Sequence, residues 1–240
     1  MTAVLDGKIV LVTGAGSGIG AATVQLIRAR GGVAVGTDLA GADLMHDVTD
    51  PAAWDRVLAE TVARHGRLDG LVSNAGVADY GALTDIDLEA FRRSYRVNVE
   101  AAFIGIQKAV AQFRRQGVPA QGAVVVTASV MATQAAPGTA SYAATKAALQ
   151  NMARAIGVEL GRKGDFIRVN AVAPGPVRTP MLASAMPAGA MDDPETWADV
   201  PLKEPCEPED VAQAIAFLLS DEASFMTSAV LTLDGGWSLT

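Results

Sequence analysis

The sequence predicts an α/β fold, in which helices cover both faces of one parallel sheet. Two observations predict it: apolar segments rich in β-branched residues recur along the chain, and longer segments with helical periodicity separate them. The apolar segments are continuous instead of alternating, as expected for strands that are buried on both faces. They are KIVLV (8–12), VAVGT (33–37), GLVSN (70–74), AVVVTA (123–128), FIRVNAVA (166–173) and AVLTLD (229–234). We therefore expect a doubly wound sheet of about seven strands in a single domain over residues 1–240.

The segments between these strands carry helix signals. Segment 50–66 begins with Asp50 as its capping residue and Pro51 in the first turn, and it ends at Gly66. Similar patterns predict helices over 85–115, 139–161 and 208–219. Residues 181–208 interrupt the alternation with five prolines and three methionines. We expect this segment to be a lid over a substrate, with a contact between subunits as the alternative.

The composition excludes several classes of function. The chain has a formal net charge of −7, which argues against nucleic-acid binding, because that affinity depends on Lys and Arg that meet phosphates. The single cysteine, Cys206, is expected to be an inert thiol in a reducing compartment. His46 and His65 are expected at the surface, so no metal site is predicted. Neither a secretory signal nor a membrane-spanning apolar segment is recognisable, and we expect a cytoplasmic protein.

A glycine-rich motif, TGAGSGIG (13–20), follows the first predicted strand and opens the first helix. Its glycines at 14, 18 and 20 allow a tight turn and a close approach to a diphosphate, and the helix N-terminus presents free N–H groups to that charge. Because the motif lies between a strand and a helix, it predicts a dinucleotide-binding site.

Asp38 ends the second predicted strand, 18 residues after Gly20. A carboxylate at this position accepts hydrogen bonds from the ribose hydroxyls of the adenosine and repels a 2′-phosphate. No Lys or Arg lies in 14–19 or 39–45 to offset that repulsion. The sequence therefore favours NAD(H) over NADP(H) as the cofactor.

Tyr142 and Lys146 lie four positions apart in a predicted helix and therefore on one face of it. An ammonium near a phenol favours the phenolate, as an acid–base site requires. The spacing alone leaves two interpretations open, a catalytic pair or two ordinary residues of a helix surface.

Further motifs accompany this pair in a fixed order along the chain. A serine, Ser129, precedes Tyr142 by thirteen residues, and Asn98 lies within YRVNVEAAF. The other motifs are SNAG (73–76), PGPVRT (174–179) and LDGG (233–236). Together with the glycine motif, they resemble the short-chain dehydrogenase/reductase family over essentially the whole chain. The resemblance implies a Rossmann-type fold and favours the catalytic pair.

The resemblance also implies roles for individual residues. Tyr142 would exchange a proton with the substrate oxygen, and Lys146 would lower the pKa of the phenol and bind the nicotinamide ribose. Ser129 would hold the same substrate oxygen, and Asn98 would hold a water that links Lys146 to solvent. The residues implied for NAD binding are Gly14, Ser17, Gly18, Ile19, Gly20, Asp38, Asp47, Val48, Asn74, Ala75, Gly76, Tyr142, Lys146, Pro174, Gly175, Val177 and Thr179.

The sequence departs from the family pattern at two places. Eight residues separate Asp38 from Asp47, where the family has a longer helix, so the chain is expected to run almost directly from the second strand to the third. Ser73 replaces the first asparagine of the family motif N-N-A-G, and Asn74 keeps the second.

The resemblance places apolar or small residues beside the substrate, in addition to the lid. They are Val130, Met131, Ala136, Gly175 and Pro176. These residues offer no cluster of cations for a carboxylate or phosphate, and Arg178 is the one cation nearby. We therefore expect a neutral secondary alcohol, a cyclic polyol or a hydrophobic ketone as the substrate. A 3-oxoacyl-thioester reductase of the same family is the alternative. A dinucleotide sensor without turnover and a methyltransferase are further interpretations, and neither has a use for the Tyr–Lys pair.

The family also implies a homotetramer. Its subunits would meet through the helices at 85–115 and 139–161 and through the last strand.

Overall fold

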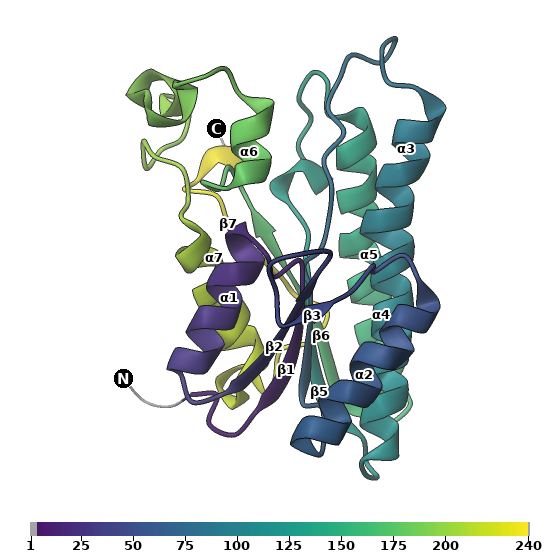
Figure 1. The fold of residues 1–240 in the computed structure, drawn as a ribbon. Helices are drawn as coiled ribbons and strands as arrows, with labels where there is room; N and C mark the ends of the chain where they lie inside the picture. Colours follow the sequence, from purple (N-terminus) through teal and green to yellow (C-terminus); the bar gives the residue numbers. More distant parts are fainter. Residues whose placement is uncertain (1–3, 240) are drawn as a thin grey trace.

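The computed structural model describes residues 4–239, and these residues form the predicted α/β fold (Figure 1). Seven parallel strands make one sheet in the order β3-β2-β1-β4-β5-β6-β7. They are β1 (Ile9–Thr13), β2 (Val33–Asp38), β3 (Leu44–Met45), β4 (Gly70–Ser73), β5 (Gln121–Thr127), β6 (Phe166–Pro174) and β7 (Val230–Leu233). The strand order reverses between β1 and β4, and the carboxyl ends of these strands are the usual place for a ligand in such sheets.

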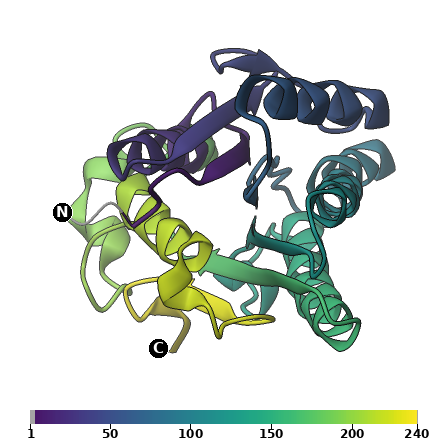
Figure 2. The same cartoon turned by 90° about the horizontal axis from the view of Figure 1, so that it is seen from below.

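The helices form two layers, one on each face of the sheet (Figure 2). α1 (Gly18–Ala29) and α7 (Pro208–Leu219) cover one face, and α2 (Pro51–His65), α4 (Ala101–Arg115) and α5 (Ala140–Arg162) cover the other. The short α6 (Pro180–Ala185) follows β6. The predicted boundaries of α2 are confirmed, because Asp50 accepts a hydrogen bond from the Ala52 N–H at 2.8 Å and Gly66 ends the helix with φ +85°.

The single helix predicted over 85–115 is divided in the structure. α3 (Leu88–Tyr95) leads into a π-helix (Arg96–Glu100), and α4 begins at Ala101. The π turn contains Asn98, and such turns often mark functional sites. The sequence pattern does not reveal the division, because the apolar period of an α-helix continues on both sides of it.

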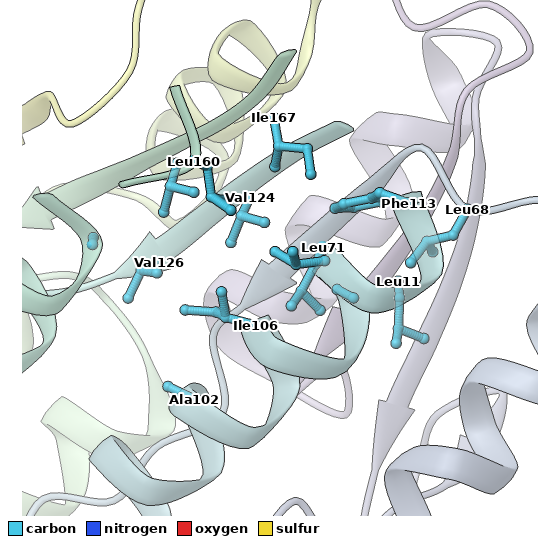
Figure 3. Packing of buried hydrophobic residues seen from close by; sticks show 14 of the residues in the cluster. Leu11, Leu68, Leu71, Ala102, Ile106, Phe113, Val124, Val126, Leu160 and Ile167 are labelled. Carbon is cyan, nitrogen blue, oxygen red and sulfur yellow. The ribbon is translucent and has the colours of Figure 1, made fainter. Parts of the chain in front are cut away.

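The larger hydrophobic core lies between the sheet and the layer of α2, α4 and α5 (Figure 3). Leu71 of β4 and Ile106 and Phe113 of α4 are fully buried members of this cluster. Helices pack closely where small residues meet large ones: a Cβ on Gly105 would lie 2.4 Å from the Trp54 ring. Burial of these apolar side chains is the main force that fixes the helices on the sheet.

The chain runs from β2 to β3 without an intervening helix among residues 39–43, as expected from the short spacing. Asp43 holds this connection, because its Oδ2 accepts hydrogen bonds from the Gly36 N–H at 2.7 Å and from Arg28 Nη2 at 2.6 Å. β3 has only two residues, which pair with Thr37 and Asp38 of β2. No apolar segment in the sequence marks so short a strand.

His46 directly follows β3 and is buried, so the expectation that it lies at the surface is wrong. Its Nδ1 lies 3.0 Å from the Thr37 hydroxyl oxygen, and its ring meets the Trp54 ring edge-on with 4.5 Å between the centroids. Burial is the main cause that lowers the pKa of His46 to about 4. His46 is therefore neutral at physiological pH. His65 is exposed, as expected.

The buried imidazole predicts a pH-dependent stability. Because the folded protein binds a proton at His46 less readily than the unfolded chain, this contribution is complete above pH 6.5 and is lost as the pH falls toward about 4. The free energy of unfolding should change by up to about 1.4 kcal/mol per pH unit from this one group. Urea unfolding at a series of pH values in this window measures the slope, and His46→Gln should reduce it. His65→Gln is the control, and equal slopes for the parent and His46→Gln would contradict the prediction.

Candidate active site

A cavity of about 690 Å³ lies at the carboxyl ends of the central strands. Most residues that the sequence assigned to the site line it together. They are Gly14, Ser17, Gly18, Ile19, Asp38, Asn74, Ala75, Gly76, Ser129, Tyr142, Lys146, Pro174, Gly175, Val177 and Thr179. Four assigned residues do not line it: Gly20, Asp47, Val48 and Asn98.

The glycine motif forms the turn from β1 into α1 at one end of the cavity. Gly14 has φ +68° and Gly18 has φ +51°, values that residues with side chains rarely adopt. Gly20 does not line the cavity, and its role is close packing: a Cβ there would lie 2.0 Å from the Gly14 oxygen. Ser17 precedes α1, and its side chain makes no capping hydrogen bond with the described residues. The first N–H groups of α1 therefore remain available to an anion.

The SNAG segment is tied to this turn by hydrogen bonds. The Asn74 side chain donates to the Thr13 oxygen at 3.1 Å and to the Gly14 oxygen at 3.3 Å. The Thr13 hydroxyl in turn accepts from the Asn74 and Ala75 N–H groups. Asn74 thus contributes to the shape of the glycine turn, and the replacement at Ser73 leaves these bonds intact.

Asp38 lies at the end of β2 and lines the cavity beside the glycine turn. Its Oδ2 accepts a hydrogen bond from the Gly16 N–H at 2.9 Å, and its Oδ1 accepts one from the Leu39 N–H at 2.7 Å. An ionised carboxylate has about four acceptor positions, so lone pairs remain for ribose hydroxyls. Among the residues that line the cavity, Lys146 is the only Lys or Arg.

Asp47 and Val48 do not line the cavity, and their expected contact with the cofactor stays a prediction. Asp47 is exposed, and hydrogen bonds from the Thr49 hydroxyl and N–H hold the pKa of its carboxyl below the usual value. Val48 packs against the larger core, and its oxygen accepts a hydrogen bond from Trp54 Nε1 at 2.8 Å. Both residues therefore serve the turn into α2.

Tyr142, Lys146 and Ser129 form a buried group at the other end of the cavity. Tyr142 and Lys146 lie four apart on α5, and the Lys146 Nζ lies 5.5 Å from the centroid of the Tyr142 ring. The same Nζ donates a hydrogen bond to the Thr127 oxygen at 2.8 Å. Ser129 follows β5, and its Oγ accepts a hydrogen bond from the Met131 N–H at 3.2 Å. The structure thus brings together the three side chains that the resemblance implied.

The pKa values of Tyr142 and Lys146 both depart from their ordinary values. Burial is the main cause that raises the pKa of Tyr142, the nearby Tyr80 adds to the shift, and a hydrogen bond with Ser129 opposes it. Burial also lowers the pKa of Lys146 to about 8. Burial is thus the dominant effect on the phenol, and the lowering of its pKa expected from Lys146 and the oxidised cofactor stays a prediction. Tyr142 is protonated at neutral pH, the state that donates a proton to a ketone.

Asn98 is buried in the π-helix and does not line the cavity. Its Oδ1 accepts a hydrogen bond from the Val77 N–H at 2.8 Å, and its Nδ2 donates to the Val77 oxygen and to the Thr145 hydroxyl, each at 2.9 Å. These bonds connect the SNAG loop to α5 next to Lys146. The Asn98 side chain therefore holds this loop against α5. The water relay expected of Asn98 stays a prediction.

The substrate end of the cavity has apolar walls. Met131, Ala136, Gly175 and Pro176 line it as expected, whereas Val130 lies behind the wall in the core. Sequence analysis missed Tyr80 and Trp237, which also line the cavity. The rings of Tyr80 and Tyr142 are 5.4 Å apart between centroids. Trp237 directly follows the LDGG motif, which is the one signal in the sequence that pointed to its position.

Only the first part of the expected lid contributes to the cavity. Met181, Leu182, Ala185 and Met186 line it from α6 and the following residue. Later in the segment, the side chains of Trp197 and Val200 are buried. The backbone of Cys206 forms an isolated β-bridge with that of Val177. Burial raises the pKa of the Cys206 thiol to about 11, which is consistent with an inert thiol.

Arg178, the cation expected near the substrate, is already paired. It forms ion pairs with Asp192 at 2.8 Å and Glu207 at 2.9 Å and does not line the cavity. A charged group on a substrate would therefore meet no free cation at this end of the cavity.

Comparisons with known proteins agree with this geometry. A family model described as enoyl-(acyl carrier protein) reductase matches residues 14–238. The chain is 38% identical over 249 residues to a 2,5-dichloro-2,5-cyclohexadiene-1,4-diol dehydrogenase of Sphingobium indicum, and this alignment covers 98% of each of the two chains. It is 36% identical to the cis-4-hydroxycyclohexanecarboxylate dehydrogenase of Sinomonas cyclohexanicum over 96% of each. A 3-ketoacyl-(acyl-carrier-protein) reductase from Brucella melitensis, solved in complex with NADH, superposes with a TM-score of 0.89 at 29% identity, covering 97% of this chain and 99% of that one.

The fold, the glycine turn and the Ser–Tyr–Lys group define an oxidoreductase that acts on CH–OH groups with a nicotinamide dinucleotide. The chain belongs to the short-chain dehydrogenase/reductase family. No helix within residues 4–239 is long and apolar enough to cross a membrane.

Proposed function

We propose that the protein transfers hydride between NAD(H) and an uncharged secondary alcohol or its ketone. The observation that carries the proposal is the single cavity, which joins the glycine turn and Asp38 at one end to Ser129, Tyr142 and Lys146 at the other. These residues fit a dinucleotide, because free N–H groups at the start of α1 suit the diphosphate and the Asp38 carboxylate suits the adenosine ribose.

The nicotinamide, when bound, supplies the hydride donor or acceptor. For reduction, Tyr142 gives its phenol proton to the ketone oxygen, and for oxidation it takes the proton of the alcohol. To act as a base, Tyr142 must be a phenolate. Burial raises its pKa and opposes that state, so the positive charge of the oxidised cofactor would have to favour it. Ser129 donates a hydrogen bond to the same oxygen and stabilises charge that develops there.

Asp38 supports NAD(H) as the cofactor. Its carboxylate lies at the cavity end that would receive the adenosine, and a 2′-phosphate there would meet this negative charge with no lining cation nearby. The NADH complex of the Brucella melitensis relative is consistent with this preference.

Charge at the other end of the cavity supports an uncharged substrate. Arg178 is paired with Asp192 and Glu207, and the Lys146 ammonium is committed to the Thr127 oxygen. The Sphingobium indicum relative is named for an uncharged cyclic diol, which agrees with such a cavity. The Sinomonas cyclohexanicum relative is named for a hydroxy acid, whose carboxylate agrees less well with a cavity that offers no free cation among the lining residues. Neither the thioester reductase nor the sensor alternative is better supported.

We also propose a homotetramer in the cytoplasm. Phe103 on α4 and Val158 on α5 are large apolar residues about half exposed, as helices that meet another subunit would require. Sedimentation velocity of the purified protein tests the number of subunits.

Initial rates with NAD⁺ over a panel of secondary alcohols, cyclic diols and hydroxy acids test the proposed reaction. We expect NADH formation with uncharged alcohols, and kcat/KM at least about tenfold lower for hydroxy acids of the same carbon skeleton, because a buried unpaired carboxylate is costly. Equal rates for a cyclic alcohol and its carboxylated analogue would contradict the substrate class. No turnover of any alcohol, with measurable NADH binding, would favour the sensor.

A further inference from the structure

Trp237 occupies a special position among the described aromatic residues. It lines the cavity and packs against the cluster of Val130, Met131 and Tyr142. This cluster includes the phenol that would exchange the proton. Trp54 and Trp197, the other two tryptophans, are almost fully buried and do not line the cavity.

We propose that Trp237 determines the substrate class by packing against a carbocyclic ring, so that the enzyme selects alicyclic over small acyclic secondary alcohols. This inference rests on the proposed function and adds the shape of its substrate.

The turn that carries Trp237 is held by its own side chains. Asp234 Oδ1 accepts a hydrogen bond from the Gly236 N–H at 2.9 Å, and its Oδ2 accepts one from the Ser238 N–H at 2.8 Å. Gly235 and Gly236 have φ +62° and +88°, which allow the chain to turn back toward the cavity. Trp237 therefore lies between two positions that one carboxylate fixes.

Two distant segments hold the same turn from outside. Gln134, in the loop between Ser129 and Tyr142, donates from Nε2 to the Ser238 oxygen. On another side, a Cβ on Gly235 would lie 2.9 Å from Val200, and one on Gly236 would lie 3.0 Å from Pro201. A turn held in this way fixes the backbone of Trp237, and such preorganisation increases the affinity gained from contact.

The chemistry of the surrounding wall favours a ring. Met131, Met181, Met186 and Tyr80 line the same cavity as Trp237, and Met131 belongs to the cluster against which Trp237 packs. Aromatic faces and thioethers gain contact area with a six-membered ring that a short acyclic chain does not supply. Because catalysis needs only the oxygen beside Ser129 and Tyr142, the wall affects which carbon skeleton binds and leaves the proton transfer unchanged.

Steady-state oxidation of cyclohexanol and 2-butanol by the parent, Trp237→Ala and Trp237→Phe tests the selection. We expect Trp237→Ala to lower kcat/KM for cyclohexanol by at least about tenfold, mainly through KM, because contacts equivalent to one or more methylenes are lost. The value for 2-butanol should change less than about threefold, and Trp237→Phe should keep most of the preference. Leu239→Ala is the control, since this exposed residue of the same turn does not line the cavity.

A binding measurement tests the contact without turnover. Cyclohexanol added to the complex with NADH should change the tryptophan fluorescence of the parent, because it alters the surroundings of the indole, and the same titration of Trp237→Phe should show at most a small change. An equal loss of kcat/KM for both alcohols in Trp237→Ala, or a full fluorescence change that survives in Trp237→Phe, would overturn the inference. If the parent binds cyclohexanol with this fluorescence change and oxidises neither alcohol, the inference stands and the proposed function fails.

Discussion

Tyr142→Phe is expected to lower kcat by about 10²–10⁴-fold, the usual contribution of a positioned proton donor or acceptor. The phenyl ring keeps the packing of Tyr142 in the cluster with Val130 and Met131, so the fold should be preserved. The variant loses the group that takes the proton of the alcohol, so hydride transfer to NAD⁺ would leave the carbonyl oxygen protonated with no base to accept that proton. Single-turnover formation of NADH measures the loss. Titration with NADH should give a Kd close to that of the parent.

Tyr80→Phe is the matched control for this prediction. This variant removes the phenol hydroxyl of Tyr80, whose ring centroid lies 5.4 Å from that of Tyr142 in the same cavity. Because Tyr80 makes no hydrogen bond to Ser129, we expect kcat to stay within about threefold of the parent, far from the loss expected for a catalytic group. Full activity of Tyr142→Phe, or an equal loss in both variants, would refute the assignment of Tyr142.

Asp38→Asn is expected to weaken the discrimination against NADPH by at least about tenfold, because it removes a negative charge that opposes a 2′-phosphate. The asparagine oxygen can still accept the hydrogen bond from the Gly16 N–H, which Asp38→Ala would lose. The glycine turn should therefore keep its shape, and the effect should come from charge. Fluorescence titrations with NADH and NADPH measure the ratio of the two Kd values.

A second substitution strengthens the test. Leu39 lines the cavity beside Asp38 and is 66% exposed, so Leu39→Arg added to Asp38→Asn offers a cation to the 2′-phosphate without displacing the core. We expect the double variant to prefer NADPH. Asp47→Asn is the matched control, because this exposed carboxylate lies outside the cavity and should leave the ratio unchanged. If Asp38→Asn retains the full preference of the parent, Asp38 does not contact the ribose.

Local signals were sufficient to predict the fold class and the glycine turn with Asp38 at the cofactor end of the site, and the family resemblance supplied the other cofactor residues. Continuous apolar strands predicted a covered parallel sheet, and six of the strands lie where the sequence placed them. The glycine motif predicted its turn because glycine readily adopts the positive φ values that Gly14 and Gly18 have in the structure. Tyr142 and Lys146 meet because helical geometry places positions four apart on one face.

The sequence by itself thus determined the strand segments and the glycine turn, since these signals lie within short stretches of the chain, and it favoured the pair of Tyr142 and Lys146 only together with the family resemblance. Only the tertiary structure decided the burial of His46, the exclusion of Asp47 from the cavity and the place of Trp237 in its wall. It also shows that burial raises the pKa of Tyr142. The physical reason is common to all four: desolvation and contact depend on residues that are distant in sequence, and no local pattern carries that information.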